Sequence, residues 1–427
     1  MQVNKIFIIS LITGIFFACK ISGQPVIDSV YEKNIHTVQI YRDGNELSYP
    51  FMELNSADKL KLCFDDFSNE VKNYYYSLVH CNSNWEPSDI STSDYIDGFT
   101  QNQITSHVFS INTLINYIHY SVLFPNENCK PKISGNYIIK VYEDFDETKL
   151  VLTKRFYITE TVAGVNLEIT RPDIPKYMLK GQQFKITVMP NVSDFTDLKN
   201  EIKIVINQNG MPCRTKSYLL SRLINGTTLV YDDLDSNIFD GGNEFRNFDI
   251  KSIKFQSARI KKIEYSGQYY TIKLLPDEWK SKTRYFFDND LNGNYFIENS
   301  LGVDKTNDAD YVMVCFNLPT KEPLIDGAIY VYGALTNWKC DQASKMSYNL
   351  ETQTYELKLL IKQGYYNYQY AYKPTNSNEV DLTIAEGNHY ETENDYLVFV
   401  YYKQFSSRYE RLIGFRIANS IKKSDKN

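Results

Sequence analysis

Apolar side chains recur at every second position along much of this chain. In residues 59–66 (KLKLCFDD), Leu60, Leu62 and Phe64 fall on one face of an extended segment, and residues 73–81 (NYYYSLVHC) alternate in the same way. Successive side chains of a β-strand point to opposite faces of its sheet, so this spacing predicts strands that bury one face. No helical period extends convincingly beyond a turn or two. We therefore expect a chain built from β-sheets.

The amino-acid composition agrees with this expectation. The 35 tyrosines and 24 phenylalanines suit the half-buried surface of a sheet better than a helix. A length of 427 residues corresponds to about three domains at roughly 150 residues each. We predict an all-β fold of tandem immunoglobulin- or fibronectin-like β-sandwich modules, at residues 24–160, 161–305 and 306–420, with a solvated tail at 421–427. The net charge of −6 offers no basic surface, so nucleic acid is not an expected partner.

The first 23 residues have the form of a signal peptide. The apolar run at residues 6–18 is too short to span a bilayer, and small residues follow it up to an expected cleavage site after Gly23. A rival interpretation makes Cys19 a lipid anchor, but Phe16 stands where a lipoprotein signal usually has an aliphatic residue. Both interpretations predict export, and plain cleavage is the favoured one. No later apolar run is long enough for a membrane-spanning helix.

The cysteines are widely spaced and form no C-x-x-C motif. An exported protein can hold disulfides, and Cys63 and Cys81 could lie on neighbouring strands. Buried free thiols are an equally open alternative, because spacing alone does not establish a pairing. Six cysteines follow Cys19: Cys63, Cys81, Cys129, Cys213, Cys315 and Cys340.

Two strands joined by an acidic turn close the first expected module. The segment SGNYIIKVYED precedes the turn at residues 144–148, and KLVLTKRFYITE follows it. Tyr137 stands at the start of the first strand, four residues after Ile133. This spacing resembles a tyrosine corner, in which the phenol hydroxyl binds a nearby backbone group. An aromatic residue that merely begins a strand is the alternative.

The adjacent residues His80 and Cys81 invite the question of a metal or catalytic site. Neighbouring residues of a strand point to opposite faces, so the two are poorly placed to bind one metal ion. The chain has five histidines and none of them lies in a recognised ligand spacing. No local signature of a nucleophilic cysteine surrounds Cys81. We therefore predict no metal site and no catalytic residue here.

Residues 288–299 (DNDLNGNYFIEN) imitate the start of a calcium-binding loop. Asp288, Asp290 and Asn292 occupy the first ligand positions, but position twelve is Asn299 where a glutamate is needed. The flanking sequences RYFF and NYFI read as strands and not as helices. A hairpin loop that uses Asp, Asn and Gly for its turn is the favoured interpretation, with a modest calcium site as the alternative.

Other acidic segments do not form a catalytic pair. The sequences FDDF (64–67) and YDDLD (231–235) are interpreted as solvated turns. The chain contains no G-x-S-x-G, Walker or G-x-G-x-x-G motif. We accordingly expect no enzymatic activity and no cofactor.

A final strand is expected near the C-terminus. In the segment RYERLIGFRIANS, alternation places Ile413, Phe415 and Ile417 on one face, which we expect to be buried. The segment is assigned to the third module, so its deletion over residues 409–420 is expected to destabilise that module.

Several separated motifs, in the same order, resemble one known family. The runs HTVQIYRDGNELSYPFMELNSADKLKLCFDDF, NYYYSLVHCNSNWEPSDISTSDYIDGF, SINTLINYIHYSVLFPNE and SGNYIIKVYED are similar to the plug protein family of the type IX secretion system of Bacteroidetes-type bacteria. The resemblance extends to YERLIGFRIANS at the end of the chain. It implies signature residues with a structural role, and no catalytic residues. These are Tyr76, His80, Cys81, Trp85, Pro87, Ser88, Tyr95, Gly98, Asn112, Thr113, His119, Tyr120, Pro125, Gly135 and Tyr137.

The resemblance also implies a function, a partner and a location. Such a protein is expected in the periplasm, at the inner face of the outer membrane. There it would bind the large translocon barrel of the secretion system and close its periplasmic opening when the cargo carrier is absent. Within the signature turn, Trp85 would fill apolar space, Pro87 would shape the turn, and His80 would be a hydrogen-bonded histidine and not a ligand.

A second and weaker resemblance covers residues 328–372. The sequences VYGALTNW and GYYNYQYAY are similar to an early-set, glycogen-binding immunoglobulin-like module. This resemblance implies sugar stacking on Trp338 and on Tyr366 or Tyr368. It supports an alternative function, that of an exported accessory protein that binds polysaccharide. The same motif also occurs as scaffold in modules that bind no sugar.

Overall fold

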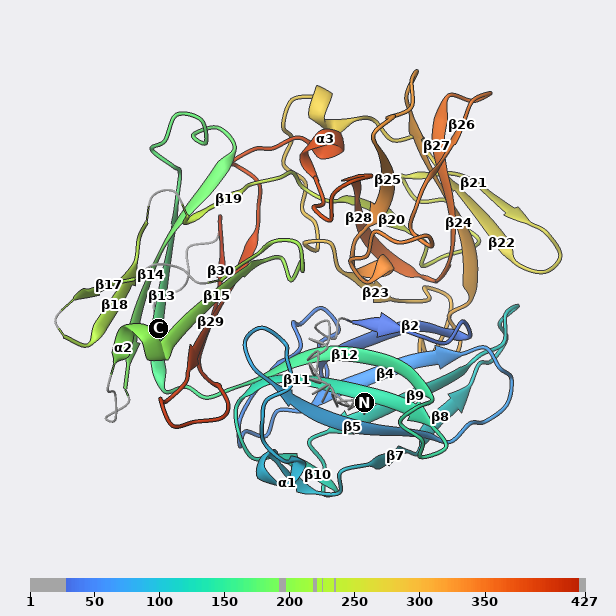
Figure 1. Ribbon diagram of the computed structural model, residues 1–427. Helices are drawn as coiled ribbons and strands as arrows, with labels where there is room; N and C mark the ends of the chain where they lie inside the picture. Colours follow the sequence, from blue (N-terminus) through green and yellow to red (C-terminus); the bar gives the residue numbers. More distant parts are fainter. Residues whose placement is uncertain (1–27, 192–196, 218–220, 225, 234–235, 422–427) are drawn as a thin grey trace, which may run out of the picture.

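The computed structural model describes residues 28–191, 197–217, 221–224, 226–233 and 236–421 (Figure 1). The expected signal peptide, Cys19 and most of the expected tail lie outside these residues. Strands dominate the described part of the chain, and its helices are single turns. The prediction of an all-β fold of sandwich modules is confirmed.

The first domain is a sandwich of two antiparallel sheets. One has the strand order β1-β12-β11-β5-β7, with β3 added parallel to β12, and the other has the order β2-β4-β9-β8. Their bounds are β1 Ser29–Val30, β2 Ile35–Arg42, β3 Phe51–Glu53, β4 Leu60–Asp66, β5 Tyr74–Cys81, β7 Asn102–Ile104, β8 Ser106–Phe109, β9 Ile118–Phe124, β11 Gly135–Glu143 and β12 Leu150–Thr159. The helix α1 (Thr92–Tyr95) and the short pair β6 (Ile96–Gly98) and β10 (Cys129–Pro131) close one end.

The alternation read from the sequence defines the core of this domain. Leu60, Leu62 and Phe64 are fully buried, and Tyr74 and Tyr76 of β5 pack into the same cluster. Tyrosine rings meet edge to face there, as in the pair Phe64 and Tyr74 with centroids 5.2 Å apart. Each buried phenol needs a polar partner for its hydroxyl, so the tyrosine-rich core also contains many specific hydrogen bonds.

The second sandwich combines two distant parts of the chain. One sheet has the order β13-β14-β18-β17 with β19 beside β14, and the other has the order β16-β15-β29-β30. Their bounds are β13 Ala163–Thr170, β14 Gly181–Pro190, β15 Ile202–Gln208, β16 Thr215–Ser217, β17 Arg222–Ile224, β18 Thr228–Tyr231, β19 Ile238–Asp240, β29 Asp395–Tyr402 and β30 Arg411–Asn419, with the helix α2 at Leu198–Glu201. Residues of β14, β15, β29 and β30 share one core.

The third sandwich is formed by the intervening residues. Its sheets have the orders β20-β28-β23, with β25 beside β28, and β21-β22-β24-β27-β26. The bounds are β20 Arg246–Asp249, β21 Ile260–Tyr265, β22 Tyr270–Leu274, β23 Tyr295–Ile297, β24 Tyr311–Pro319, β25 Gly327–Tyr332, β26 Ser347–Asn349, β27 Thr354–Lys362 and β28 Gly364–Pro374, with the one-turn helices η1 Lys280–Lys282, η2 Ala334–Thr336 and α3 Thr383–Glu386.

This pairing differs from the module boundaries expected from the sequence. The expected boundary at residue 305 falls inside the third sandwich, because β20 and β23 pair with β28. The last two strands leave the expected third module, because β29 pairs with β15. The spacing of apolar residues identifies a strand but not the strand with which it pairs. It therefore cannot reveal that one domain is inserted into another. We propose domains at residues 28–160, at 163–240 with 395–419, and at 246–386.

The strand β30 forms as expected, but its faces differ from the simple alternation. Ile413 is fully buried in the core of the second domain, whereas Phe415 and Ile417 are half-buried on the opposite face with Leu412. The register against β29 slips by one residue at this point, since Val400 pairs with Gly414 and Tyr401 pairs with Leu412. This bulge turns Ile413 away from the residues expected beside it.

The outer face of β29 and β30 meets the first domain. Leu397, Phe399, Tyr401 and Leu412 form a small core against Tyr49 and Tyr157. Figure 1 shows the three domains around a common centre, with the first below, the second at the left and the third at the upper right. Each strand of the β29–β30 pair therefore has a face in contact with its own sandwich and a face in contact with the first domain.

Candidate functional site

The signature histidine lies in a closed hydrogen-bonded turn. His80 is 1% exposed, its Nδ1 lies 2.7 Å from Ser88 Oγ, and its Nε2 lies 3.1 Å from the carbonyl oxygen of Ser134. A carbonyl accepts, so Nε2 carries the proton and Nδ1 accepts from the serine hydroxyl. Burial lowers the pKa of His80 to about 4, which keeps the ring neutral near pH 7. Both nitrogens are thus used within the fold.

Two signature glycines sit where the backbone leaves no room for a side chain. At Gly135 (φ +149°) a Cβ atom would lie 2.2 Å from Nε2 of His80, and at Gly98 (φ +108°) it would lie 2.3 Å from the carbonyl oxygen of Asn128. Both φ values also favour glycine. Gly135 thus lets the start of β11 approach His80, and Gly98 lets β6 approach the backbone of Asn128 before β10.

The predicted tyrosine corner is present. Tyr137 is fully buried, and its hydroxyl donates to the carbonyl oxygen of Ile133 at 2.8 Å. Its ring meets the imidazole of His80 edge to face, with centroids 5.1 Å apart. The corner and the histidine turn therefore form one structural unit at the start of β11.

The signature tryptophan lies at the surface and joins the turn to β12. Trp85 adopts a left-handed backbone conformation (φ +66°). Its ring lies 5.2 Å from that of Tyr157, and the guanidinium of Arg155 lies 4.9 Å from its centroid. Pro87 is exposed and forms an isolated antiparallel β-bridge with Cys81. The tryptophan thus fills half-buried space and adds a cation–π contact.

The remaining signature residues support the first domain at separate places. The hydroxyl of Tyr76 accepts from Asn126 at 2.9 Å, and that of Tyr95 donates to the carbonyl oxygen of Leu78 at 3.3 Å. The hydroxyl of Tyr120 accepts from the backbone amide of Lys72 at 2.8 Å.

Three further signature residues lie in irregular parts of the first domain. Pro125 follows a cis peptide bond, and Asn112 has a positive φ. The hydroxyl of Thr113 is buried without a partner among the described residues. The signature is therefore distributed, and the structure does not bring it together into one site.

A cluster that the sequence did not indicate lies between the first and third domains. Asp65 is 1% exposed and accepts from Lys362 Nζ at 2.7 Å, from the hydroxyl of Tyr311 at 2.6 Å and from His119 Nδ1 at 2.7 Å. The ammonium of Lys362 also lies 4.0 Å from the ring centroid of Tyr117. The interpretation of FDDF as a solvated turn is wrong, because Asp65 and its neighbour Asp66 end a buried strand.

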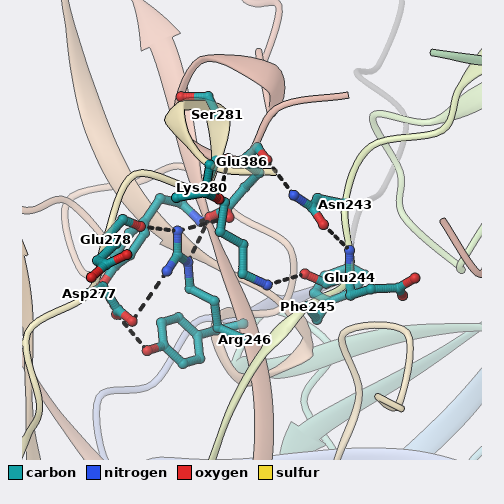
Figure 2. A network of polar contacts seen from close by, with 12 residues as sticks. Asn243, Glu244, Phe245, Arg246, Asp277, Glu278, Lys280, Ser281 and Glu386 are labelled. Carbon is teal, nitrogen blue, oxygen red and sulfur yellow. Dashed lines mark hydrogen bonds and ion pairs between the residues drawn. The ribbon is translucent and has the colours of Figure 1, made fainter. Parts of the chain in front are cut away.

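A second buried network lies within the third domain (Figure 2). Arg246 contacts Asp277 at 3.2 Å and Glu386 at 3.0 Å, and all three side chains are at most 6% exposed. Burial by itself lowers the pKa of Arg246, but the two carboxylates outweigh burial and raise it. The hydroxyls of Tyr368 and Tyr370 both donate to Asp277 Oδ2 at 2.7 Å.

The surroundings of this network are internal as well. Lys280 donates to the carbonyl oxygen of Glu244 at 2.7 Å, and Asn243 donates to that of Glu386 at 2.7 Å (Figure 2). Charged groups at these positions therefore connect β20, β28, η1 and α3 with one another. Most polar atoms of this arrangement contact other groups of the described chain, although Glu244 Oε2 is buried there without a hydrogen-bond partner.

The expected sugar-stacking residues are not available as a group. Tyr366 is 2% exposed and Tyr368 is fully buried, so neither ring can stack on a ligand. Tyr366 donates to the carbonyl oxygen of Lys362 at 2.5 Å. Only Trp338 is partly exposed, with its ring 5.3 Å from that of Tyr332. Inward-facing tyrosines of a strand cannot be told from outward-facing ones without the register.

In the acidic segment at residues 288–299, Asp290 shapes the turn, and both Asp288 and Asp290 also accept hydrogen bonds from residues 245–247. Asp290 accepts from the backbone amide of Asn292 at 2.6 Å and from that of Phe245, and Asp288 accepts from Asn247 at 3.1 Å. Asn299 donates to the carbonyl oxygen of Asp308 at 2.8 Å. Of the two expected strands, only NYFI forms one (β23), and it pairs with β28. The strand expected at RYFF, and with it the expected hairpin, is therefore wrong. Within the described part of the chain, no group of three or more His, Cys, Asp or Glu residues is placed to hold a metal ion.

The six cysteines that follow Cys19 are free thiols. Cys63 and Cys81 lie on different sheets and are not bonded to each other. Burial raises the pKa of Cys63 to about 11 and that of Cys81 to about 12. Both are inert core residues under neutral conditions.

Comparison with known proteins gives a family and a close structural relative. Residues 35–160 match the family described as "Type 9 secretion system plug protein 1st domain". A crystal structure of a hypothetical protein from Parabacteroides merdae ATCC 43184 is similar with a TM-score of 0.88 and 33% sequence identity. The match covers 92% of this chain and 99% of that one. No protein of curated function matches the chain significantly. None of the helices in the described residues is long and apolar enough to cross a membrane.

Proposed function

Because the chain belongs to the type IX secretion system plug protein family, we propose that it is a periplasmic plug of this system. In this role the protein binds the large outer-membrane translocon barrel and closes its periplasmic opening when the cargo carrier is absent. The observation that carries the proposal is the family match over residues 35–160, which cover the whole core of the first domain.

The way the domains are joined supports a role that depends on shape. The first and third domains share the buried pair Asp65 and Lys362, and the first and second share a hydrogen bond of 2.7 Å from the Tyr401 hydroxyl to Asn136. The second and third meet where Cys213 Sγ lies 3.1 Å from the Tyr332 hydroxyl. The two interfaces of the first domain thus contain buried polar contacts, and the interface between the second and third domains contains a partly buried one. Such contacts depend on one relative orientation of the domains. Domains joined in this way are expected to keep a fixed relative orientation, and therefore a fixed surface shape, when a partner binds.

The chemistry of the described residues is consistent with a protein that is not an enzyme. In the two buried charged clusters, around Asp65 and Arg246, the charged groups form ion pairs with one another. In this proposal, residues 1–23 direct export and the mature protein works at the periplasmic face of the outer membrane. Anchoring through a lipid on Cys19 is the less favoured alternative.

The polysaccharide-binding alternative has lost its principal support. It required Tyr366 or Tyr368 to face a sugar, and both are buried in the core of the third domain. We therefore propose protein contact, and not glycan contact, as the primary function.

The proposal is tested by recovery of the partner from the native host. A tagged full-length chain, expressed at its natural level, is expected to co-purify the large translocon barrel from detergent-solubilised membranes. A tagged variant without residues 2–23 serves as the control, because it should remain in the cytoplasm and recover no barrel. Removal of the gene is expected to make the envelope permeable to a large antibiotic, and the intact gene should restore the barrier. Membranes that yield no barrel, or an envelope that stays equally tight, would contradict the proposal.

A further inference from the structure

Two cysteines from different domains lie beside one tyrosine. Cys213 is in the turn between β15 and β16 of the second domain, and its Sγ lies 3.1 Å from the hydroxyl oxygen of Tyr332. Cys340 follows η2 in the third domain and packs against the small cluster that contains Tyr332 and Met211. Both thiols therefore belong to the interface between the second and third domains.

The chain segments around the two cysteines also meet. Pro212, which precedes Cys213, and Trp338, which lies two residues before Cys340, line the same cavity at the domain junction. Neither cysteine is part of a strand. A disulfide needs Cα atoms within about 7 Å of each other, and irregular segments adjust to such a separation more readily than paired strands do. The backbone on both sides is therefore suited to a bond between the two sulfurs.

The two thiols also influence the same ionisations. Burial and the Cys213 thiolate together raise the pKa of Cys340 to about 12. Burial raises the pKa of Tyr332, and the thiolates of both cysteines raise it further. Charge interactions weaken with distance, so these effects require the groups to be near one another. Negative charge on one sulfur thus opposes negative charge on the other.

The pair differs from the other cysteines in its access to solvent. The other four cysteines that follow Cys19 are buried, whereas Cys213 is exposed and Cys340 is half-buried. Desolvation of its sulfur raises the pKa of Cys213, but the Tyr332 hydroxyl and the Arg214 guanidinium lower it. The thiolate is the form that attacks a disulfide, and access decides which thiol reacts. Cys213 is therefore the thiol that an oxidant reaches first.

From these observations we propose that Cys213 and Cys340 form a disulfide that joins the second domain to the third when the protein meets a disulfide oxidant. The third domain is inserted into the second, so the chain crosses between them twice. The two crossings lie side by side, because the amide of His389 donates to the carbonyl oxygen of Gly242 at 2.8 Å. Two adjacent crossings act as a single hinge, and the disulfide adds a third connection that restrains it. The bond does not depend on the proposed plug function.

The reaction balances as an exchange with a second disulfide, for which glutathione disulfide is the probe. The Cys213 thiolate attacks one sulfur of the oxidant, forms a mixed disulfide and releases one glutathione thiolate. This step also removes the negative charge that opposes ionisation of Cys340. The Cys340 thiolate then attacks the sulfur of Cys213 and releases the second glutathione thiolate. The two protein thiols lose two electrons and two protons, and the oxidant gains them.

The test exposes the purified full chain to glutathione disulfide, blocks the remaining thiols and maps the peptides by mass spectrometry. One disulfide is expected for each chain, between Cys213 and Cys340. It should persist in a buffer with equal concentrations of reduced and oxidised glutathione. The control Cys315→Ser removes a buried cysteine of the third domain and should form the same bond. In Cys340→Ser, glutathione should stay on Cys213, because no second thiol displaces it.

The natural protein alone gives the decisive peptide map, so a variant that misfolds does not affect the main result. In the natural protein, amide hydrogen exchange at the crossings, residues 241–245 and 387–394, should be slower in the oxidised than in the reduced form. The proposal is overturned if Cys213 and Cys340 stay unlinked, if the natural protein retains glutathione on Cys213, or if either cysteine bonds to a different one. Equal exchange in the two forms would contradict the added restraint on the hinge.

Discussion

Lys362 of β27 donates to Asp65 of β4 at 2.7 Å across the boundary between the third and first domains, and the two side chains are only 2% and 1% exposed. A buried ion pair is weak evidence for net stability, because both charges lose their hydration. Removing one partner is a different matter, since it leaves the other charge alone in the interior. The pair therefore fixes which surfaces of the two domains can meet.

The first prediction concerns this pair. Lys362→Met leaves the Asp65 carboxylate without its cation, so the free energy of unfolding should fall by about 3–5 kcal/mol. Asp65→Asn should have a cost of similar size, and the double variant should cost clearly less than the sum of the two. Urea unfolding of the four proteins measures the coupling. Lys262→Met, which removes an exposed ion pair with Glu264, is the control and should leave the urea midpoint unchanged. Additive effects at Asp65 and Lys362 would mean that the pair is not coupled.

The second prediction concerns acid stability and His80. The ring is protonated near pH 6.5 in the unfolded chain but only near pH 4 in the folded one, so the unfolded state binds the extra proton between these values. The stability contributed by neutral His80 is complete above pH 6.5 and is lost as the pH falls towards 4, by up to about 3 kcal/mol. His36 and His389 act in the same direction. The thermal midpoint of His80→Gln should therefore fall less steeply between pH 7 and pH 5 than that of the natural protein. Identical slopes would contradict the buried neutral ring.

The third prediction concerns Gly135. In Gly135→Ala the new methyl group would collide with the imidazole of His80, and the backbone would be strained by its φ of +149°. We expect a loss of about 2–4 kcal/mol in the free energy of unfolding. Gly44→Ala is the matched control, because Gly44 also has a positive φ (+83°) but has nothing within 4 Å of its Cβ position. Its cost should stay near about 1 kcal/mol. Equal losses in the two variants would show that the collision is absent.

The fourth prediction concerns the last strand. Deletion of residues 409–420 removes β30, which pairs with β29 and contributes Ile413 to the core of the second domain. Hydrogen exchange should then accelerate in β15 and β29, while β24 and β27 of the third domain remain protected. Ile325→Ala, which alters an exposed side chain of the third domain, should change neither region. Loss of protection confined to β24 and β27 would instead support the third-module assignment made from the sequence.

Local features of the fold followed directly from the sequence. The two-residue period of β4 and β5 predicted the strands and their buried faces, since alternation is a property of the chain itself. The Tyr137 corner was also predictable, because its partner Ile133 is only four residues away. The family was recognisable for a similar reason, because its motifs are short contiguous segments that occur in a fixed order along the sequence.

Features that depend on distant partners were missed. Asp65 was predicted to be solvated because the lysine that pairs with it, Lys362, lies 297 positions away in the sequence. Tyr366 and Tyr368 were interpreted as possible sugar contacts. The sequence shows that they share one face of β28 but not whether that face is buried. The third module was given the wrong strands because β29 finds its partner in β15.

The amino-acid sequence by itself determined the all-β class, the buried face of many strands, the tyrosine corner and the family. Only the tertiary structure decided which strands share a sheet, which acidic residues are buried and how the second domain is assembled from two distant parts of the chain. The physical reason is the separation in sequence over which each kind of interaction acts. Strand periodicity and turn chemistry act over a few residues, whereas desolvation and charge pairing depend on the groups that folding brings close from anywhere in the chain.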